Sequence, residues 1–321
     1  MSDICAAIQQ ETQRCVLATI IEVEGHAYRK EGVSMLFIEQ GHALGNISPG
    51  CLENDLQARV TSILDEGKAC KVEYDMRPTD DMMWGENIGC GGRIMVLLEP
   101  IMGELRTILS QMDDMFNRGE SVQLERMIRE QDLEVTYHLQ SFTSTSPIVS
   151  TMVESMAEGG DESTHGLVSV LSTYYSKPRL IILGAGDDVI PVVKLAMRIG
   201  FRVTVADWRS ELCITSRFPG ATLFIDFPSS LFNKLHITHA DYVLLLSHQF
   251  QREREFLELL QEVPCAYVGI MGSKERTSRL MEGLSPFPTL SSPVGKDIGA
   301  EGPEEIAISI AAELVELKRS R

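Results

Sequence analysis

One stretch, residues 177–209, constrains the fold more than any other part of the chain. An apolar run at 180–183 leads into a turn with Gly184 and Gly186. Apolar residues at helical spacing follow, and then a second apolar run that ends at Asp207. A glycine turn between two such runs, with an acidic residue about 20 positions further on, is typical of the βαβ unit of dinucleotide-binding folds. The stretch therefore predicts a Rossmann-like parallel sheet in the C-terminal part of the chain.

The rest of the C-terminal part continues this sheet. Apolar runs at 221–227, 241–248 and 265–273 are predicted to be three more strands. Helices are expected at 252–263, at 273–284 and from Pro303 onward. Ser273 is placed to cap the second of these helices, and Pro303 lies in the first turn of the last one, where its missing N–H costs nothing.

The N-terminal part has a different pattern and predicts a smaller α/β domain. Helical spacing covers residues from Leu52 to the C-cap Gly67, and it recurs over 102–132. The remaining apolar runs predict strands at 14–23, 33–41, 70–76, 93–100, 134–140 and 167–175.

Length and composition predict two soluble domains. The 321 residues exceed the ~100–200 of a typical single domain, and we place the boundary so that the domains are 1–176 and 177–321. A Ser/Thr/Gly-rich surface loop or linker is expected near 142–166. The sequence contains neither a membrane-spanning run nor a secretory signal pattern, so we expect a cytoplasmic protein without a membrane partner.

Charge and cysteine content exclude several classes of function. A net charge of −17 argues against a nucleic-acid partner, because phosphate binding needs clustered Lys and Arg. The seven cysteines are scattered and contain no CxxC pair, which excludes a zinc ribbon and argues against a disulfide framework.

Two of the cysteines lie where a thiol could be chemically active. Cys51 is at the start of the predicted helix, a position that stabilises a thiolate. Cys90 lies in a turn with Gly91 and Gly92, where glycine leaves the thiol unshielded and lets a ligand approach the backbone. Most of the other cysteines lie in or near apolar runs, which indicates a role in packing.

The glycine loop of the C-terminal part favours an anionic ligand in one respect and opposes it in another. Gly184 and Gly186 permit close backbone approach, and the helix N-terminus beyond them attracts anions. However, Val189 replaces the third small residue of the fingerprint, and Asp187 and Asp188 compete with a diphosphate for the helix end. A bound NAD-like nucleotide therefore stays an open alternative.

Further candidate residues follow the other strands of the sheet. Asp207 is placed to hold a ribose hydroxyl, or alternatively to cap its own loop. His248 follows the fourth strand and is either a ligand-edge residue or an ordinary hydrogen-bonding one. Gly272 and Ser273 follow the fifth strand and form either part of the nucleotide site or a tight turn.

Taken together, these blocks resemble the XdhC/CoxI family of accessory proteins for molybdenum hydroxylases. The resemblance covers nearly the whole chain and is weakest from about 105 to 170. It rests on residues 25–35, 45–55, 89–100, 183–209, 244–248, 267–276 and 293–314. It implies a two-domain protein, expected to be a homodimer, that binds the molybdenum cofactor and supports exchange of an oxo for a sulfido ligand. Such a protein then delivers the cofactor to a xanthine dehydrogenase-type enzyme.

The resemblance also assigns roles to individual residues. Cys51 and Cys90 match cysteines in the glycine-rich loops of the family, and Arg29 and Glu53 match its recurring basic and acidic residues. Thiolates suit a sulfur-rich molybdenum centre, so Cys90 is also the candidate metal ligand. The chain departs from the family pattern at Tyr28, Pro49 and 187–189.

Three hypotheses of function follow. The leading one is a chaperone for the molybdenum cofactor without independent catalysis, since the chain lacks iron–sulfur cysteine spacing and room for flavin and molybdopterin domains. Whether the sulfur comes from a separate cysteine desulfurase stays open. The rival is an NAD(P)-dependent oxidoreductase that uses His248 as acid or base, and the third is a non-catalytic docking scaffold.

Overall fold

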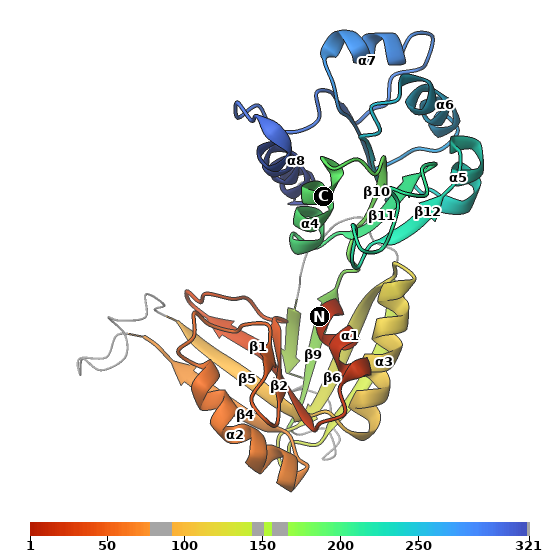
Figure 1. The fold of residues 1–321 in the computed structure, drawn as a ribbon. Helices are drawn as coiled ribbons and strands as arrows, with labels where there is room; N and C mark the ends of the chain where they lie inside the picture. Colours follow the sequence, from red (N-terminus) through yellow and green to blue (C-terminus); the bar gives the residue numbers. More distant parts are fainter. Residues whose placement is uncertain (78–91, 143–150, 156–165, 320–321) are drawn as a thin grey trace. The chain divides into compact units, whose positions relative to one another are not determined.

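The computed structural model describes residues 1–77, 92–142, 151–155 and 166–319 (Figure 1). The chain divides into two compact units between Ser176 and Lys177. We call them the N-terminal unit and the C-terminal unit and describe each by itself.

The N-terminal unit is built on an antiparallel five-stranded sheet with the order β3-β2-β1-β5-β4. Its strands are β1 (Cys15–Glu24), β2 (Ser34–Ile38), β3 (Ala43–Leu44), β4 (Cys70–Asp75) and β5 (Arg93–Pro100). The central strand β1 is buried over its first seven residues, because both faces of the sheet are covered. This explains why its sequence is a continuous apolar run without alternation.

Helix α2 (Glu53–Glu66) covers one face of this sheet. Its buried residues Leu56, Val60, Ile63 and Leu64 recur at helical spacing and pack on alternate residues of β1 and β2. Gly67 ends the helix in the left-handed conformation, with φ 63°, and its N–H donates to the carbonyl of Ile63 at 3.0 Å. The predicted helix and its C-cap are thus confirmed.

The other face is covered by two helices and a second sheet. Helices α1 (Ser2–Gln10) and α3 (Gly103–Asn117) lie side by side and share one apolar cluster with β1 and β2 (Figure 1). The second sheet is antiparallel with the order β7-β6-β9-β8. Its strands are β6 (Ser121–Arg129), β7 (Val135–Phe142), β8 (Thr151–Ser155) and β9 (Leu167–Tyr174).

Two expectations for this region are wrong. The helix predicted over 102–132 ends at Asn117, and the rest of that stretch forms β6. Its inward residues Val122, Leu124 and Ile128 do alternate, but the fourth inward position is Arg126, a charge that hides the period of two. Likewise, β8 lies within the loop expected near 142–166 and pairs with β9.

A buried ion pair joins the two sheets. Arg126 of β6 is 0% exposed and Glu99 of β5 is 1% exposed. The Nε atom of Arg126 donates to both carboxylate oxygens of Glu99, at 3.2 and 3.0 Å, and the Tyr137 hydroxyl of β7 donates to the same carboxylate at 2.9 Å. Removing one partner of such a pair leaves a buried charge uncompensated, which is costly.

The C-terminal unit is a six-stranded parallel sheet with the order β12-β11-β10-β13-β14-β15. This is the 3-2-1-4-5-6 order of the Rossmann fold, with its reversal between β10 and β13. The predicted fold class is confirmed. The strands are β10 (Arg179–Leu183), β11 (Arg202–Asp207), β12 (Thr222–Ile225), β13 (Tyr242–Leu245), β14 (Tyr267–Ile270) and β15 (Leu290–Ser291).

Helices cover both faces of the parallel sheet. Helices α4 (Val189–Arg198) and α8 (Gly302–Arg319) lie side by side on one face (Figure 1). Helices α5 (Pro228–Leu235), α6 (Phe250–Leu260) and α7 (Lys274–Leu280) pack on the other. The Ser273 cap is confirmed, since its hydroxyl accepts the Arg276 N–H at 3.2 Å. No helix in the described ranges is long and apolar enough to cross a bilayer.

We predict that the N-terminal unit depends strongly on the buried ion pair. Arg126→Met leaves the Glu99 carboxylate buried without its counter-charge and should lower the free energy of unfolding by about 3–5 kcal/mol. Adding Glu99→Gln removes that charge and should recover much of the loss. Urea unfolding followed by circular dichroism measures both effects.

Arg129 provides the matched control for this prediction. It lies on the same strand, but its side chain is half exposed and pairs with Asp132 and Glu134 at the surface. Arg129→Met should therefore leave the unfolding curve nearly unchanged. Equal losses in the Arg126 and Arg129 variants would contradict the role of the buried pair.

Candidate functional site

The loop before α2 is organised by two side chains, Ser48 and Glu53. The Glu53 carboxylate accepts the N–H groups of Ile47 at 3.1 Å and Ser48 at 2.7 Å, as well as the Ser48 hydroxyl. The Ser48 oxygen in turn accepts the N–H groups of Gly50 and Leu52, each at 3.1 Å. The loop that carries Cys51 is thus fixed from both ends.

Cys51 is attached to this network through its thiol. Its Sγ lies 3.5 Å from the Ser48 oxygen, and Ser48 donates its own proton to Glu53. The side chain is half buried. The arrangement therefore connects a partly accessible thiol to a carboxylate through one hydroxyl group.

Glu53 is ionised at neutral pH. Burial opposes its ionisation, but hydrogen bonds from the Ser48 hydroxyl and from the Ser48 and Ile47 amides outweigh burial and lower the pKa below its ordinary value of 4.5. The negative charge is held by N–H and O–H donors, with no cation among its hydrogen-bond partners in the described residues.

Arg29 lies beside the same loop. Its guanidinium donates to the side-chain oxygen of Asn46, and it stacks 5.1 Å from the ring centre of Tyr28, which is 53% exposed. Arg29, Ser48 and Cys51 line one hollow of about 10 Å³, which is room for a single water. A larger ligand must therefore bind at the rim of this hollow.

Gly92 must be glycine for a steric reason. A Cβ atom there would lie 2.5 Å from the carbonyl oxygen of Glu24 and 2.6 Å from that of His26, so only glycine fits against the end of β1. The other two residues predicted in this turn, Cys90 and Gly91, lie outside the described residues. The structure thus brings together Arg29, Cys51 and Glu53 of the predicted N-terminal set.

The second group of predicted residues lies at the carboxyl edge of the parallel sheet. Gly184 has φ 128°, and a Cβ atom there would lie 2.7 Å from the backbone of Leu246 and Ser247. The ends of the neighbouring strands β10 and β13 come this close together at Gly184, so packing requires a glycine at this position. Asp207 is buried at the end of β11 and accepts the Ala185 N–H at 2.7 Å.

His248 and Asp188 form a pair across this edge. The Nε2 atom of His248 lies 2.7 Å from Asp188 Oδ2, and His248 adopts φ 59°, an uncommon backbone conformation for a residue other than glycine. Its backbone N–H donates at 3.0 Å to Glu253, which is 1% exposed. This buried carboxylate also accepts the N–H and hydroxyl groups of Ser247.

Gly272 and Ser273 contribute to the same edge by holding Arg276. Ser273 caps α7, and a Cβ atom on Gly272, whose φ is 127°, would lie 3.0 Å from Cδ of Arg276. Arg276 forms an ion pair with the buried Glu253 at 2.6 Å.

The sequence did not single out Glu253, Arg276 or Ser48. Ser48 could have been found from the sequence, because a serine shortly before a helix that begins with an acidic residue indicates a hydrogen bond at the helix N-terminus.

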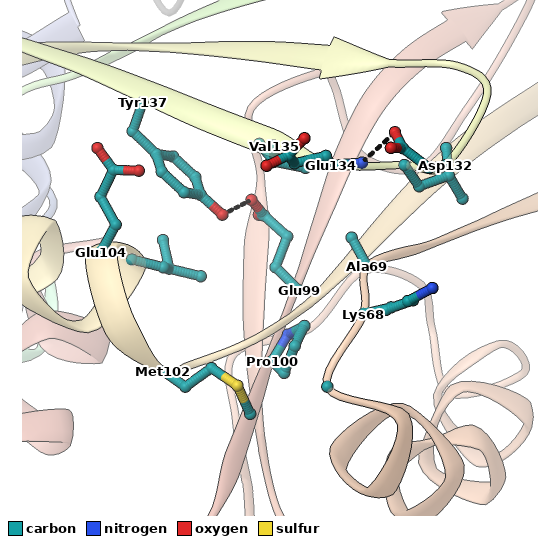
Figure 2. Close-up of a pocket in the computed structure, with 13 residues that line it drawn as sticks. Lys68, Ala69, Glu99, Pro100, Met102, Glu104, Asp132, Glu134, Val135 and Tyr137 are labelled. Atoms are coloured by element: carbon teal, nitrogen blue, oxygen red, sulfur yellow. Dashed lines mark hydrogen bonds between the residues drawn. The ribbon is translucent and has the colours of Figure 1, made fainter.

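A cavity of about 400 Å³ lies elsewhere in the N-terminal unit and was not predicted (Figure 2). Figure 2 shows the Tyr137 hydroxyl bonded to Glu99 and the Glu134 N–H bonded to Asp132 in its wall. Glu99 is near the end of β5, whereas Gly92 precedes its start, and an eight-residue strand spans about 26 Å. The cavity is therefore distinct from the Cys51 hollow. Its other lining residues are Gly67, Lys68, Ala69, Pro100, Met102, Glu104, Leu105, Leu133 and Val135.

No group of three or more His, Cys, Asp or Glu side chains in the described ranges could hold a metal ion. The metal role predicted for Cys90 falls outside those ranges and stays a prediction. Within them, Cys51 is the predicted thiol that has polar side chains around it.

We predict that Glu53→Gln loosens the Cys51 loop. Gln has one acceptor oxygen for three donors, so the free energy of unfolding should fall by about 1–3 kcal/mol at neutral pH. Because the folded-state pKa of Glu53 is lowered, this contribution is present above the ordinary value of 4.5 and is lost as the pH falls through the folded value. The difference between wild type and variant in urea unfolding should therefore shrink in acid.

Glu66 is a suitable control, since it is exposed at the other end of α2. Glu66→Gln should show neither effect. A Glu53→Gln curve that coincides with the wild-type curve at neutral pH would be inconsistent with the proposed loop network.

Comparison with known proteins assigns both units. The family described as "XdhC and CoxI family" matches residues 8–75, and the "XdhC Rossmann domain" matches residues 180–314. A relative from Bacillus subtilis, described as a probable xanthine dehydrogenase subunit, is 35% identical over 98% of this chain and 96% of its own length. "Molybdenum cofactor insertion chaperone PaoD" of Escherichia coli is 23% identical over 94% of this chain and 83% of its own length.

A solved structure extends the comparison to three dimensions. The crystal structure of a xanthine dehydrogenase from Bacillus halodurans is 39% identical in sequence, covers 100% of this chain and 96% of its own, and superposes with a TM-score of 0.82. The agreement spans both units, as does that with the Bacillus subtilis relative. The chain therefore belongs to the XdhC/CoxI family.

Proposed function

We propose that this protein is an accessory chaperone that binds the molybdenum cofactor and inserts it into a xanthine dehydrogenase-type hydroxylase. Family membership and the names of the two relatives support this assignment. The observation that carries it is the partly accessible Cys51 thiol, tied through Ser48 to the ionised Glu53. The cofactor is cargo in this proposal, and the chain itself has no independent catalytic activity.

The chemistry of the loop suits such cargo. The cofactor presents sulfur-bound molybdenum and a phosphate, and a thiolate is a soft ligand for the former. A thiol must lose its proton before it binds a metal. Cys51 can pass this proton to Ser48 while Ser48 passes its own to Glu53, and the low pKa of Glu53 then releases it to solvent.

Arg29 supplies the opposite charge at the same rim. Arg29 lines the hollow together with Cys51, and a guanidinium group can donate two hydrogen bonds to a phosphate or to oxo groups. Because the hollow holds only a single water, the cofactor would contact these residues from outside and could leave again without a large rearrangement. Loose binding at the rim is what a delivery protein requires.

We extend the proposal to sulfuration and partners. Replacement of an oxo ligand by a sulfido ligand, with the oxygen leaving as water, takes place while the cofactor is held by Cys51 and Cys90. A cysteine desulfurase supplies the sulfur as a persulfide, which thiols of the cell reduce by two electrons to hydrogen sulfide before the exchange. The chaperone acts as a cytoplasmic homodimer. Gly91 would let the cofactor approach the backbone next to Cys90.

We predict that cofactor binding depends on the loop cysteines. In an anaerobic titration with molybdenum cofactor, Cys51→Ala and Cys90→Ala should each weaken binding by at least about tenfold, because loss of a metal ligand costs more than loss of its hydrogen-bond partners. Loading of the apo-hydroxylase, measured by its recovered activity, should fall in parallel.

Cys70→Ala is the matched control. Cys70 is also half buried in the N-terminal unit, but its thiol points to the carbonyl of Lys71 on β4, away from the loop network. Its replacement should leave both measurements unchanged. Undiminished cofactor binding in both loop variants would refute the proposed site.

A further inference from the structure

The C-terminal unit has the strand order of dinucleotide-binding proteins, which raises the question of whether an NAD-like ligand fits its edge. In such folds the diphosphate lies at the N-terminus of the helix after the first strand, bound by free backbone N–H groups. The corresponding helix here is α4, and the ribose would be held by the acid at the end of β11. Both positions can be tested against the structure.

The first turn of α4 has few donors left for a phosphate. The Val189 N–H donates to the carbonyl of Gly186 at 3.2 Å, and the Ile190 N–H donates to the carbonyl of Asp187 at 3.3 Å. The third helical residue is Pro191, which has no N–H. The first three positions of the helix therefore offer no free backbone donor.

A carboxylate also covers the glycine that should face the diphosphate. A Cβ atom on Gly186 would lie 2.4 Å from Asp188 Oδ1, so this carboxylate lies directly over the glycine. The other carboxylate oxygen, Asp188 Oδ2, lies 2.7 Å from Nε2 of His248. Asp187, paired with Arg217 at 2.6 Å, adds a second negative charge at the same helix end.

The acid expected to bind ribose is already fully engaged. Asp207 Oδ1 accepts the N–H and Nε groups of Arg209 at 2.8 and 3.0 Å. Its Oδ2 accepts the Ala185 N–H at 2.7 Å and the Nη2 of Arg209 at 2.8 Å. With 0% exposure and four donors on two oxygens, Asp207 has no acceptor left for a ribose hydroxyl.

We infer that the C-terminal unit excludes dinucleotides, because the carboxylate of Asp188, held by His248, occupies the place of the nucleotide diphosphate. The Rossmann unit of this protein is thus a nucleotide-free module. At its carboxyl edge, the groups that would bind the nucleotide in a dinucleotide fold are bonded to other groups of the protein. This inference is independent of the cofactor site in the N-terminal unit.

The full-length protein can be tested with NADH and inorganic pyrophosphate. Trp208 directly follows Asp207 and reports on the edge, because NADH bound there would accept its fluorescence energy. We expect no saturable energy transfer and no calorimetric signal with pyrophosphate at ligand concentrations up to about 1 mM. Saturable binding of either probe to the wild-type protein would overturn the inference.

A gain of binding tests the cause of the exclusion. Asp187→Asn and Asp188→Gly combined with Pro191→Ala remove both charges, clear the side chain that lies over Gly186 and restore one N–H group, so saturable pyrophosphate binding is expected. Asp188→Ser alone serves as the second variant, and circular dichroism verifies folding of both. If a folded variant binds no more pyrophosphate than wild type, the assignment of exclusion to Asp188 and the helix end is wrong.

Discussion

Among the described residues of the N-terminal unit, the ion pair between Glu99 and Arg126 is the one with both side chains buried. It lies between the two sheets of that unit and is reinforced by the Tyr137 hydroxyl, so it fixes β5 relative to β6 and β7. The start of the same strand follows Gly92, which fits tightly against the end of β1. The segment containing Arg29 comes shortly after that end of β1. The buried pair thus holds one end of β5, and Ile94 near the other end of this strand lines the Cys51 hollow.

Both units use buried or half-buried carboxylates to fix loops, with opposite consequences for ligand binding. In the C-terminal unit the carboxylates of Asp207 and Glu253 accept backbone N–H groups and pair with arginines. The carboxylate of Asp188 lies over Gly186, where a diphosphate would bind. In the N-terminal unit Glu53 also fixes a loop, but a thiol at the rim of a hollow is attached to its network. In the part of the chain that the structure describes, the thiol attached to a carboxylate network is that of Cys51, which agrees with the proposed accessory role.

The sequence predicted most of the fold because apolar runs and glycine turns specify a parallel sheet directly, as at Gly184. It failed at β6, where Arg126 takes an inward position because its partner Glu99 lies on a distant strand, which local periodicity cannot reveal. For the site, glycine and cysteine positions predicted two loops, of which the structure describes the one that carries Cys51. Asp207 was recognised as a strand-end acid, but its capture by Arg209 depends on side-chain geometry. The role of Ser48 was likewise invisible without the loop conformation.

The central claim is that the cofactor is held at the Cys51 loop, and protection of thiols from alkylation tests it most directly. The protein would be treated with iodoacetamide under anaerobic conditions, with and without bound molybdenum cofactor, and modification of each cysteine followed by mass spectrometry. The account predicts that the cofactor slows alkylation of Cys51 and leaves the half-buried Cys70 and Cys265 unaffected. Equal alkylation of Cys51 with and without bound cofactor would contradict it.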